Sequence, residues 1–145
     1  MMRIVYCGLI LVALATSPSL AKTYQCTITK RSGNNTWVAP EITIYHDEIS
    51  GTVRIDDAII REVWDSPMPG KVASDNSKKV RFTWFIRGMK NDKRPTVNTW
   101  DIQRGFIYSA SFWKSTGKLT VNLFDQTQGG HMGRISGKGA CCVTP

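Results

Sequence analysis

The sequence lacks the patterns that most metal sites and many hydrolases require. Its two histidines, His46 and His131, stand far apart, and no two cysteines have the spacing C-x-x-C. A structural zinc site needs about four such ligands, usually in closely spaced pairs. The motifs G-x-S-x-G and H-E-x-x-H are missing as well. We therefore expect no bound metal, no cofactor and no standard catalytic motif.

Long apolar runs are also scarce, and the clearest one begins the chain. Ile4–Ala15 is almost wholly apolar and follows the positively charged Arg3. It is shorter than the roughly 20 residues of a membrane-spanning helix, and the small residues after it suit a signal peptidase. We therefore predict that residues 1–21 are a signal peptide cleaved after Ala21. Residues 22–145 would then be exported to the periplasm or the medium as one domain that does not span the membrane.

A sustained helical period is missing too, whereas short alternating runs recur. In the clearest run, residues 79–87, the even-numbered positions are apolar and share one face, as in a half-buried strand. A Gly-containing turn at 115–117 between two alternating runs is typical of a β-hairpin. The expected extended segments are 24–29, 41–45, 52–55, 58–64, 79–87, 96–104, 106–113, 118–124 and 134–143.

Two stretches depart from this strand pattern. The segment 58–64 is also short enough to form one turn of helix. Residues 65–79 contain Pro67, Pro69 and Gly70, a density of helix-breaking residues that excludes a helix. We expect this second stretch to be the longest irregular connection in the protein.

About eight short strands joined in sequence order predict an all-β antiparallel meander. Such a meander forms either a small closed or nearly closed barrel or a β-sandwich. We prefer the barrel because Cys26 shares the apolar face of the first strand with Tyr24 and Ile28, while Cys141 lies on the same face as Ile135 in the last strand. A bond between the two cysteines would join the strands that close the sheet and would cover their edges.

The number of cysteines is consistent with one such bond. Cys7 is lost with the signal peptide, which leaves an odd number of cysteines in an oxidising compartment, where disulfides are stable. We predict one disulfide, between Cys26 and Cys141. Cys142 would point to the other face, as a buried free thiol or as a site for an intermolecular bond.

Three short motifs carry a resemblance to known proteins. Residues 24–26 (YQC) have the form aromatic-x-Cys, residues 75–79 (DNSKK) lead into an aromatic-rich strand, and residues 137–141 have the form G-x-G-x-C. The chain resembles a group of small secreted β-proteins of alphaproteobacteria that share these motifs. The resemblance implies the same disulfide and a periplasmic location, and it implies no activity. Cys142 departs from the pattern of the group.

Charge is distributed unevenly along the exported part. Residues 22–66 carry five basic and seven acidic side chains, whereas residues 67–145 carry thirteen basic and four acidic ones. Such asymmetry is typical of a surface that meets a polyanion, although a solvated basic surface has the same composition. Nucleic acid is not expected as a partner, because an exported protein rarely meets it. We predict a patch for an anionic envelope component or an acidic protein at Lys79, Arg81, Arg87, Lys90, Lys93 and Arg94.

Large aromatic side chains are frequent for a chain of this length. In a small barrel they either line a pocket for an apolar ligand or fill the interior. Both arrangements fit the sequence, and the choice between them depends on how the rings pack. The residues predicted for a pocket are Trp84, Trp100, Phe106 and Phe112.

A secreted enzyme is the alternative to a binding protein. His46 continues the inward face of Ile42 and Ile44, as a buried general base would, although a histidine beside acids at a strand end is commonly structural. Asp56 and Asp57 form either a carboxylate pair or a turn. We assign no catalytic residue and predict a non-catalytic exported binding or envelope protein. A hydrolase-type enzyme with a scattered active site near His46 is the alternative.

Overall fold

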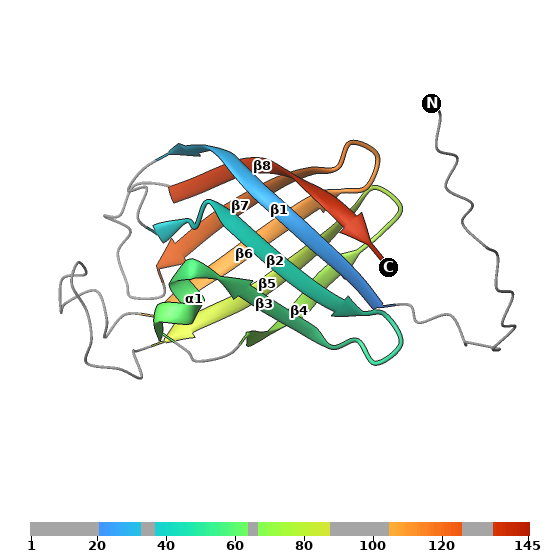
Figure 1. Cartoon of the computed structure of the whole chain (residues 1–145), viewed down its shortest axis with the longest axis horizontal. Helices are drawn as coiled ribbons and strands as arrows, with labels where there is room; N and C mark the ends of the chain where they lie inside the picture. Colours follow the sequence, from blue (N-terminus) through green and yellow to red (C-terminus); the bar gives the residue numbers. More distant parts are fainter. Residues whose placement is uncertain (1–20, 33–36, 64–66, 88–104, 126–134) are drawn as a thin grey trace, which may run out of the picture.

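The chain folds into a closed barrel of eight antiparallel strands (Figure 1). The computed structural model describes residues 21–32, 37–63, 67–87, 105–125 and 135–145. The strands are β1 (Ala21–Ser32), β2 (Glu41–Asp47), β3 (Val53–Asp57), β4 (Met68–Asp75), β5 (Lys79–Arg87), β6 (Gly105–Trp113), β7 (Lys118–Asp125) and β8 (Ile135–Thr144). A short helix, α1 (Ala58–Val63), follows β3.

Each strand pairs with the next one along the sequence, and β1 pairs with β8 to close the barrel. The prediction of a closed meander barrel is therefore confirmed. The β-sandwich alternative is wrong, because the first and last strands pair with each other instead of remaining at the edges of separate sheets. Closure also leaves neither of these strands as an open sheet edge, which would invite association with another chain.

Alternation along the strands separates an apolar interior from a more polar exterior. In β5 the even-numbered residues from Val80 to Ile86 are all buried. The hairpin of β6 and β7 has the expected register, with Tyr108 opposite Leu123. Period-two patterning therefore places the core as the sequence predicts.

The prediction of an irregular connection over residues 65–79 is wrong for Met68–Asp75, which form β4. The residues that suggested a loop are accommodated at the start of this strand. Pro69, which has no N–H to donate, pairs with Arg54 of β3, and β4 pairs with β5 only from Lys71 onward. A register shift in the middle of the β4–β5 ladder further disturbs the alternation that reveals a strand in sequence.

Two other expected segments need comment. Residues 58–64 contribute helix α1 (Ala58–Val63), the second of the two forms considered for them, and no strand. The expected segment 96–104 lies outside the described residues. Among the residues that the structure describes, no helix is long and apolar enough to cross a membrane.

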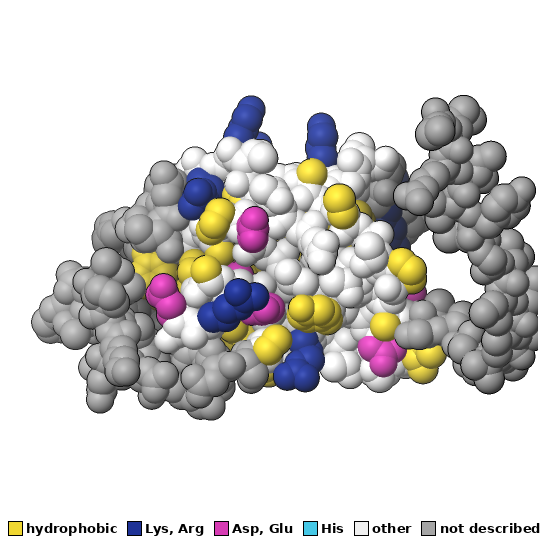
Figure 2. Space-filling view, viewed as in Figure 1, with side chains coloured by type: hydrophobic (Ala, Val, Ile, Leu, Met, Phe, Trp, Pro, Cys, Tyr) yellow, Lys and Arg dark blue, Asp and Glu magenta, His cyan; other side chains and the backbone are white. Residues whose placement is uncertain are grey.

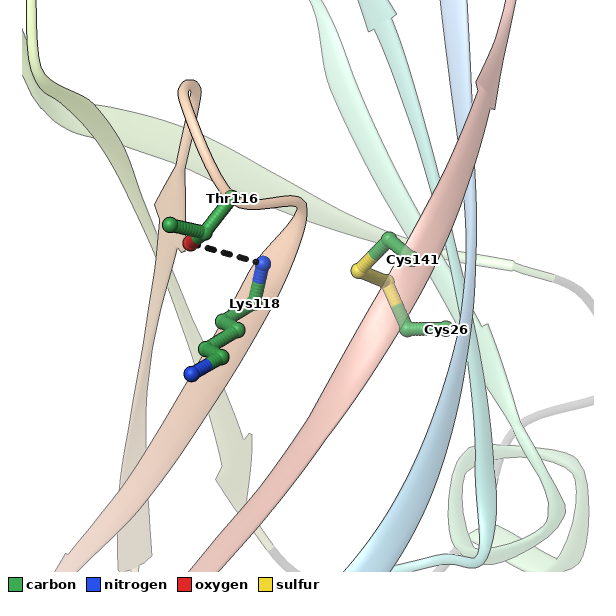
Figure 3. Close-up of a disulfide and its surroundings, with 4 residues drawn as sticks. All are labelled: Cys26, Thr116, Lys118 and Cys141. Atoms are coloured by element: carbon green, nitrogen blue, oxygen red, sulfur yellow. Dashed lines mark hydrogen bonds between the residues drawn. A yellow bond between two sulfur atoms is a disulfide. The ribbon is translucent and has the colours of Figure 1, made fainter.

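A disulfide crosses the seam between β1 and β8 (Figure 3). Cys26 and Cys141 stand directly opposite each other in the register, and their Cα atoms are 3.9 Å apart. The predicted pairing is confirmed. Cys142 carries a free thiol on the other face of β8, as predicted, but it is exposed, so the expectation of a buried thiol is wrong: the outward face of this strand meets solvent.

The same seam depends on a glycine of β8. The register of β1 shifts just after Ile28, opposite Gly139. A Cβ atom on Gly139 would overlap the carbonyl oxygen of Thr27 and would lie 2.9 Å from Cα of Ile28. On Gly137 a Cβ atom would meet only side-chain atoms. Position 139 therefore accepts only glycine, because the backbones of β1 and β8 lie in close contact there.

Candidate functional site

The distribution of charged side chains differs between the two opposite walls of the barrel. Figure 2 shows the wall formed by β8, β1, β2 and β3 with α1, on which acidic and basic side chains are intermixed. Here Lys22 pairs with Glu48 and Arg61 pairs with Asp56, at N···O distances of 2.6 and 2.7 Å. Such pairs neutralise part of the charge on this wall.

On the opposite wall, cationic side chains gather at the turns between β4 and β5 and between β6 and β7. We name them the basic turn cluster, which consists of Lys78, Lys79, Arg81, Lys114 and Lys118. The backbone N–H of Lys114 donates a hydrogen bond of 3.0 Å to the carbonyl oxygen of Lys78 and so joins the two turns. Two segments distant in sequence thereby contribute to one surface.

Asn76 shapes the first of these turns. Its Oδ1 accepts hydrogen bonds from the backbone N–H groups of Lys78 (2.9 Å) and Lys79 (3.0 Å). Its own N–H donates to the carbonyl oxygen of Lys79 at 3.0 Å. Asparagine is frequent in turns because its side chain can accept such bonds from residues just ahead. The local sequence therefore fixes the direction in which β5 begins.

Gly117 shapes the second turn, with a φ of 67° that favours glycine. Its N–H donates to the carbonyl oxygen of Trp113 at 2.9 Å, and its carbonyl oxygen accepts the N–H of Cys141 at 2.8 Å. The backbone N–H of Lys118 donates to Oγ1 of Thr116 at 3.4 Å (Figure 3). The turn that carries Lys118 is thus attached to β8 beside the disulfide.

Much of the charge of the basic turn cluster is unpaired. Lys114 Nζ lies 2.6 Å from Oδ1 of Asp75. Lys79 Nζ lies 5.0 Å from the ring centre of Trp113, an indole that is 40% exposed. Within the described part of the chain the other three members form no ion pair. The surface therefore has a net positive charge around an exposed aromatic ring.

Two of the six residues predicted for an anionic partner, Lys79 and Arg81, belong to this cluster. Arg87 is at the opposite end of β5, about 26 Å from Lys79 at roughly 3.3 Å per residue. The side chains that lie outside the described residues are those of Arg87, Lys90, Lys93 and Arg94. The structure thus brings two of the predicted residues together and does not place the side chains of the other four.

Sequence reasoning missed Lys114 and Lys118. These residues flank the predicted turn at 115–117, so the pattern of a lysine on each side of a hairpin turn was available in the sequence. The approach of Lys114 to Lys78 was not, because it extends the ladder between β5 and β6, in which Lys79 stands opposite Trp113, and the expected segment 96–104 lies between these two strands in the sequence.

The aromatic rings predicted for a pocket lie in the core. Trp84 stacks on Tyr108 with ring centres 5.1 Å apart. Phe112 meets Tyr24 edge-on at 5.0 Å, and Phe106 packs against another ring at 4.7 Å. The three pocket residues that the structure describes are all buried in this way: Trp84, Phe106 and Phe112. The fourth, Trp100, lies outside the described residues.

The two core tyrosines are held in their neutral form. Burial raises the pKa of Tyr24 to about 12, with smaller contributions from Glu48 and Asp75. Burial also raises the pKa of Tyr108, whose hydroxyl donates a hydrogen bond of 2.9 Å to the carbonyl oxygen of Trp37. Both phenols therefore act as packing groups in the barrel and not as nucleophiles.

His46 faces the interior, as predicted from its position after Ile44. It is 6% exposed, and its ring centre lies 5.5 Å from that of Phe82. Its Nδ1 has no hydrogen-bond partner, and in the described residues no hydrogen bond joins it to a carboxylate or a nucleophile. His131 lies outside these residues. The described geometry does not assemble a catalytic group around His46.

Asp56 and Asp57 have separate structural roles and do not form a carboxylate pair. Asp56 accepts two hydrogen bonds from the guanidinium of Arg61. Asp57 is buried at the start of α1, where its Oδ1 accepts the backbone N–H of Ile60 at 2.7 Å. Burial raises the pKa of Asp57 to about 6, a shift that the hydrogen bonds from Ile60 and Ile59 partly oppose.

Likeness to known proteins adds no function to this geometry. No family model, curated protein or solved structure matches this chain. The basic turn cluster and the packing of the core are therefore the basis for a functional assignment.

The buried carboxyl of Asp57 leads to a pH prediction. Because its pKa is raised from 3.8 to about 6 on folding, its contribution to stability is present below pH 4 and is lost as the pH rises through 6. An Asp57→Asn variant keeps a helix-capping side chain but does not ionise. We expect the stability of the native protein, relative to this variant, to fall by about 2–3 kcal/mol between pH 4 and pH 7.

Urea unfolding of both proteins across this pH range measures the difference. Asp56→Asn is the matched control, since it removes the neighbouring carboxylate without touching the buried cap. A constant difference between the native protein and Asp57→Asn across the range would show that Asp57 does not titrate in this way.

Proposed function

We propose that the protein is an exported, non-catalytic docking protein that binds an anionic lipid surface of the cell envelope through the basic turn cluster. The observation that carries this proposal is the set of unpaired lysine and arginine side chains around the half-exposed indole of Trp113. Export is part of the proposal. It is supported by the features of residues 1–21 and by the disulfide.

The chemistry of the cluster suits a lipid surface in two ways. Each lysine or arginine close to an anionic leaflet contributes about 1 kcal/mol of attraction. Tryptophan favours the headgroup region, where its ring is partly buried and its N–H remains near water. The hydrogen bond between the two turns also fixes the spacing of the charges before binding, so that less conformational entropy is lost on docking.

The packing of the barrel favours docking on the exterior over an apolar ligand in the interior. The buried rings of Trp84, Tyr108, Phe112 and Tyr24 are in mutual contact and occupy space that such a ligand would need. The geometry around His46 favours a binding protein over a hydrolase, because no described hydrogen bond prepares this histidine for proton transfer.

Removal of three charges tests the docking surface. A variant with Lys79→Ser, Arg81→Ser and Lys118→Ser is expected to bind vesicles containing phosphatidylglycerol roughly 100-fold more weakly at low salt, from about 1 kcal/mol per cation and 1.4 kcal/mol per factor of ten. The difference should shrink as salt rises, because exposed charges are screened within about 10 Å at 0.1 M ionic strength. Vesicle co-sedimentation over a salt series measures both effects.

A control with the same loss of charge separates local docking from general attraction. The variant Lys30→Ser, Arg54→Ser and Arg61→Ser changes exposed residues of β1, β3 and α1 and is expected to bind nearly as well as the native protein. Equal weakening in the two triple variants would mean that only net charge matters. Failure of the native protein to bind phosphatidylglycerol vesicles would refute the proposal.

A further inference from the structure

A groove on the outer wall of the barrel opens where β4 leaves β5. The ladder between β4 and β5 ends at Lys71, which stands opposite Thr83. The residues of β4 that precede Lys71 pair only with β3. Pro69 lies in that part of β4 and cannot donate a hydrogen bond to β5. The resulting half-open groove has a volume of about 370 Å³ and is lined by Pro69, Gly70, Lys71, Thr83, Trp84, Phe85 and Ile107.

One end of the groove is apolar. Phe85 stands opposite Ile107, and Ile107 stands opposite Phe124 in the next strand, so the three side chains form one row across β5, β6 and β7. Phe124 is 53% exposed, although it is a large hydrophobic residue. A row of apolar side chains on the outer face of a barrel is unusual for a wall that meets only water, and it offers a surface for an alkyl chain.

The other end of the groove is polar and positively charged. Lys71 is exposed and forms no ion pair within the described residues. Thr83, directly opposite it in the register, has a buried Oγ1 without a hydrogen-bond partner. A buried hydroxyl without a partner costs stability, and an incoming acceptor would remove this cost. None of the described residues that line the groove is acidic.

The geometry points to a binding site for a single-chain fatty carboxylate in this groove. The carboxylate would accept a hydrogen bond from the Lys71 ammonium and, once rotation of the Thr83 side chain turns its buried hydroxyl into the groove, a second one from that hydroxyl. The chain would lie along Phe85 and Ile107 towards Phe124. A volume of 370 Å³ accommodates about a dozen groups the size of a water molecule, at about 30 Å³ each, which suits a chain of medium length. The site adjoins Arg81 of the basic turn cluster, which is two residues from Thr83 on the outward face of β5, but it includes no residue of the cluster and does not depend on the docking proposed for it.

Three probes separate the contributions of head and chain. Decanoate has both, 1-decanol has the chain with a neutral head, and acetate has the head alone. Titration calorimetry with the exported protein, below micellar concentrations, is expected to show one site for decanoate, roughly tenfold weaker binding of 1-decanol and no binding of acetate. A charge-assisted hydrogen bond of about 1.5 kcal/mol gives this factor.

Variants at each end of the groove complete the test. Lys71→Ser should weaken the binding of decanoate roughly tenfold and leave the binding of 1-decanol unchanged. Phe85→Thr should weaken the binding of both probes at least about tenfold, since burial of a phenylalanine contributes about 1.5–3 kcal/mol. Ile107→Thr serves if Phe85→Thr fails to fold, because threonine suits an exposed strand position. Lys30→Ser, at an exposed position of β1, is the matched control and should bind decanoate normally.

Two results would overturn this inference. One is equal affinity for decanoate and 1-decanol together with no effect of Lys71→Ser, which would leave the charged end without a role. The other is decanoate binding that survives both Phe85→Thr and Ile107→Thr, which would place the chain elsewhere on the protein.

Discussion

Loss of the disulfide between Cys26 and Cys141 is expected to lower the free energy of unfolding by roughly 2–5 kcal/mol, the usual range for a native disulfide in a small domain. The two cysteines are 115 residues apart in sequence, and the chain-entropy model gives roughly 4–5 kcal/mol for a loop of this length. The double variant Cys26→Ala and Cys141→Ala avoids placing a hydroxyl in the core, where Cys26 is buried. Urea unfolding of the oxidised native protein and of the variant measures the loss.

Cys142→Ser is the control for this experiment. Cys142 is exposed and is not part of the disulfide, so its replacement should leave the unfolding midpoint unchanged. Peptide mapping without reduction should find the bond between residues 26 and 141 in both the native protein and this control. A double variant as stable as the native protein would show that the β1–β8 seam closes without help from the bond.

Gly139→Ala is expected to destabilise the protein by at least about 3 kcal/mol, the upper end of the roughly 1–3 kcal/mol that overpacking usually costs. The added Cβ would overlap the carbonyl oxygen of Thr27. A side chain can rotate away from such a contact, but the backbone of β1 can retreat only if the strands separate next to the disulfide. Thermal and urea unfolding report the loss of stability.

Gly137→Ala is the matched comparison, two residues away on the same face of β8. There the added Cβ would lie 2.8 Å from Cγ1 of Val38, a side-chain atom that can shift. We expect a smaller loss of stability than for Gly139→Ala. Equal losses at the two positions would mean that the contact with the β1 backbone is not the cause.

Much of the core and the closure of the sheet could be predicted from local patterns. The alternation in β5 identifies its buried face because the side-chain period of a strand is two. Parity also placed Cys26 and Cys141 on the same face, and it placed Cys142 outward. These predictions succeed because they depend on residues one or two positions apart.

The features that escaped prediction depend on contacts between distant segments. Pro67 and Pro69, just before and at the start of β4, suggest a loop, and the segment is a strand because β3 accepts Pro69 in its ladder. The basic turn cluster needs the hydrogen bond between Lys114 and Lys78, two residues that no sequence period relates. The groove beside Phe85 exists only because β4 and β5 stop pairing at Lys71.

The order of strands in the barrel has a consequence for how the chain folds. Each strand from β1 to β8 pairs with its successor, so these seven pairings join segments that are neighbours in sequence, whereas the pairing of β1 with β8 brings together residues 115 apart in sequence. Contacts of such separation carry a larger loop-closure entropy and slow the folding of β proteins. Until this last pairing forms, β1 and β8 are both open edges that can associate with other chains. Oxidation of Cys26 and Cys141 requires the two cysteines to approach closely, as they do in the closed barrel, and the bond then holds β1 and β8 together so that these edges reopen less readily.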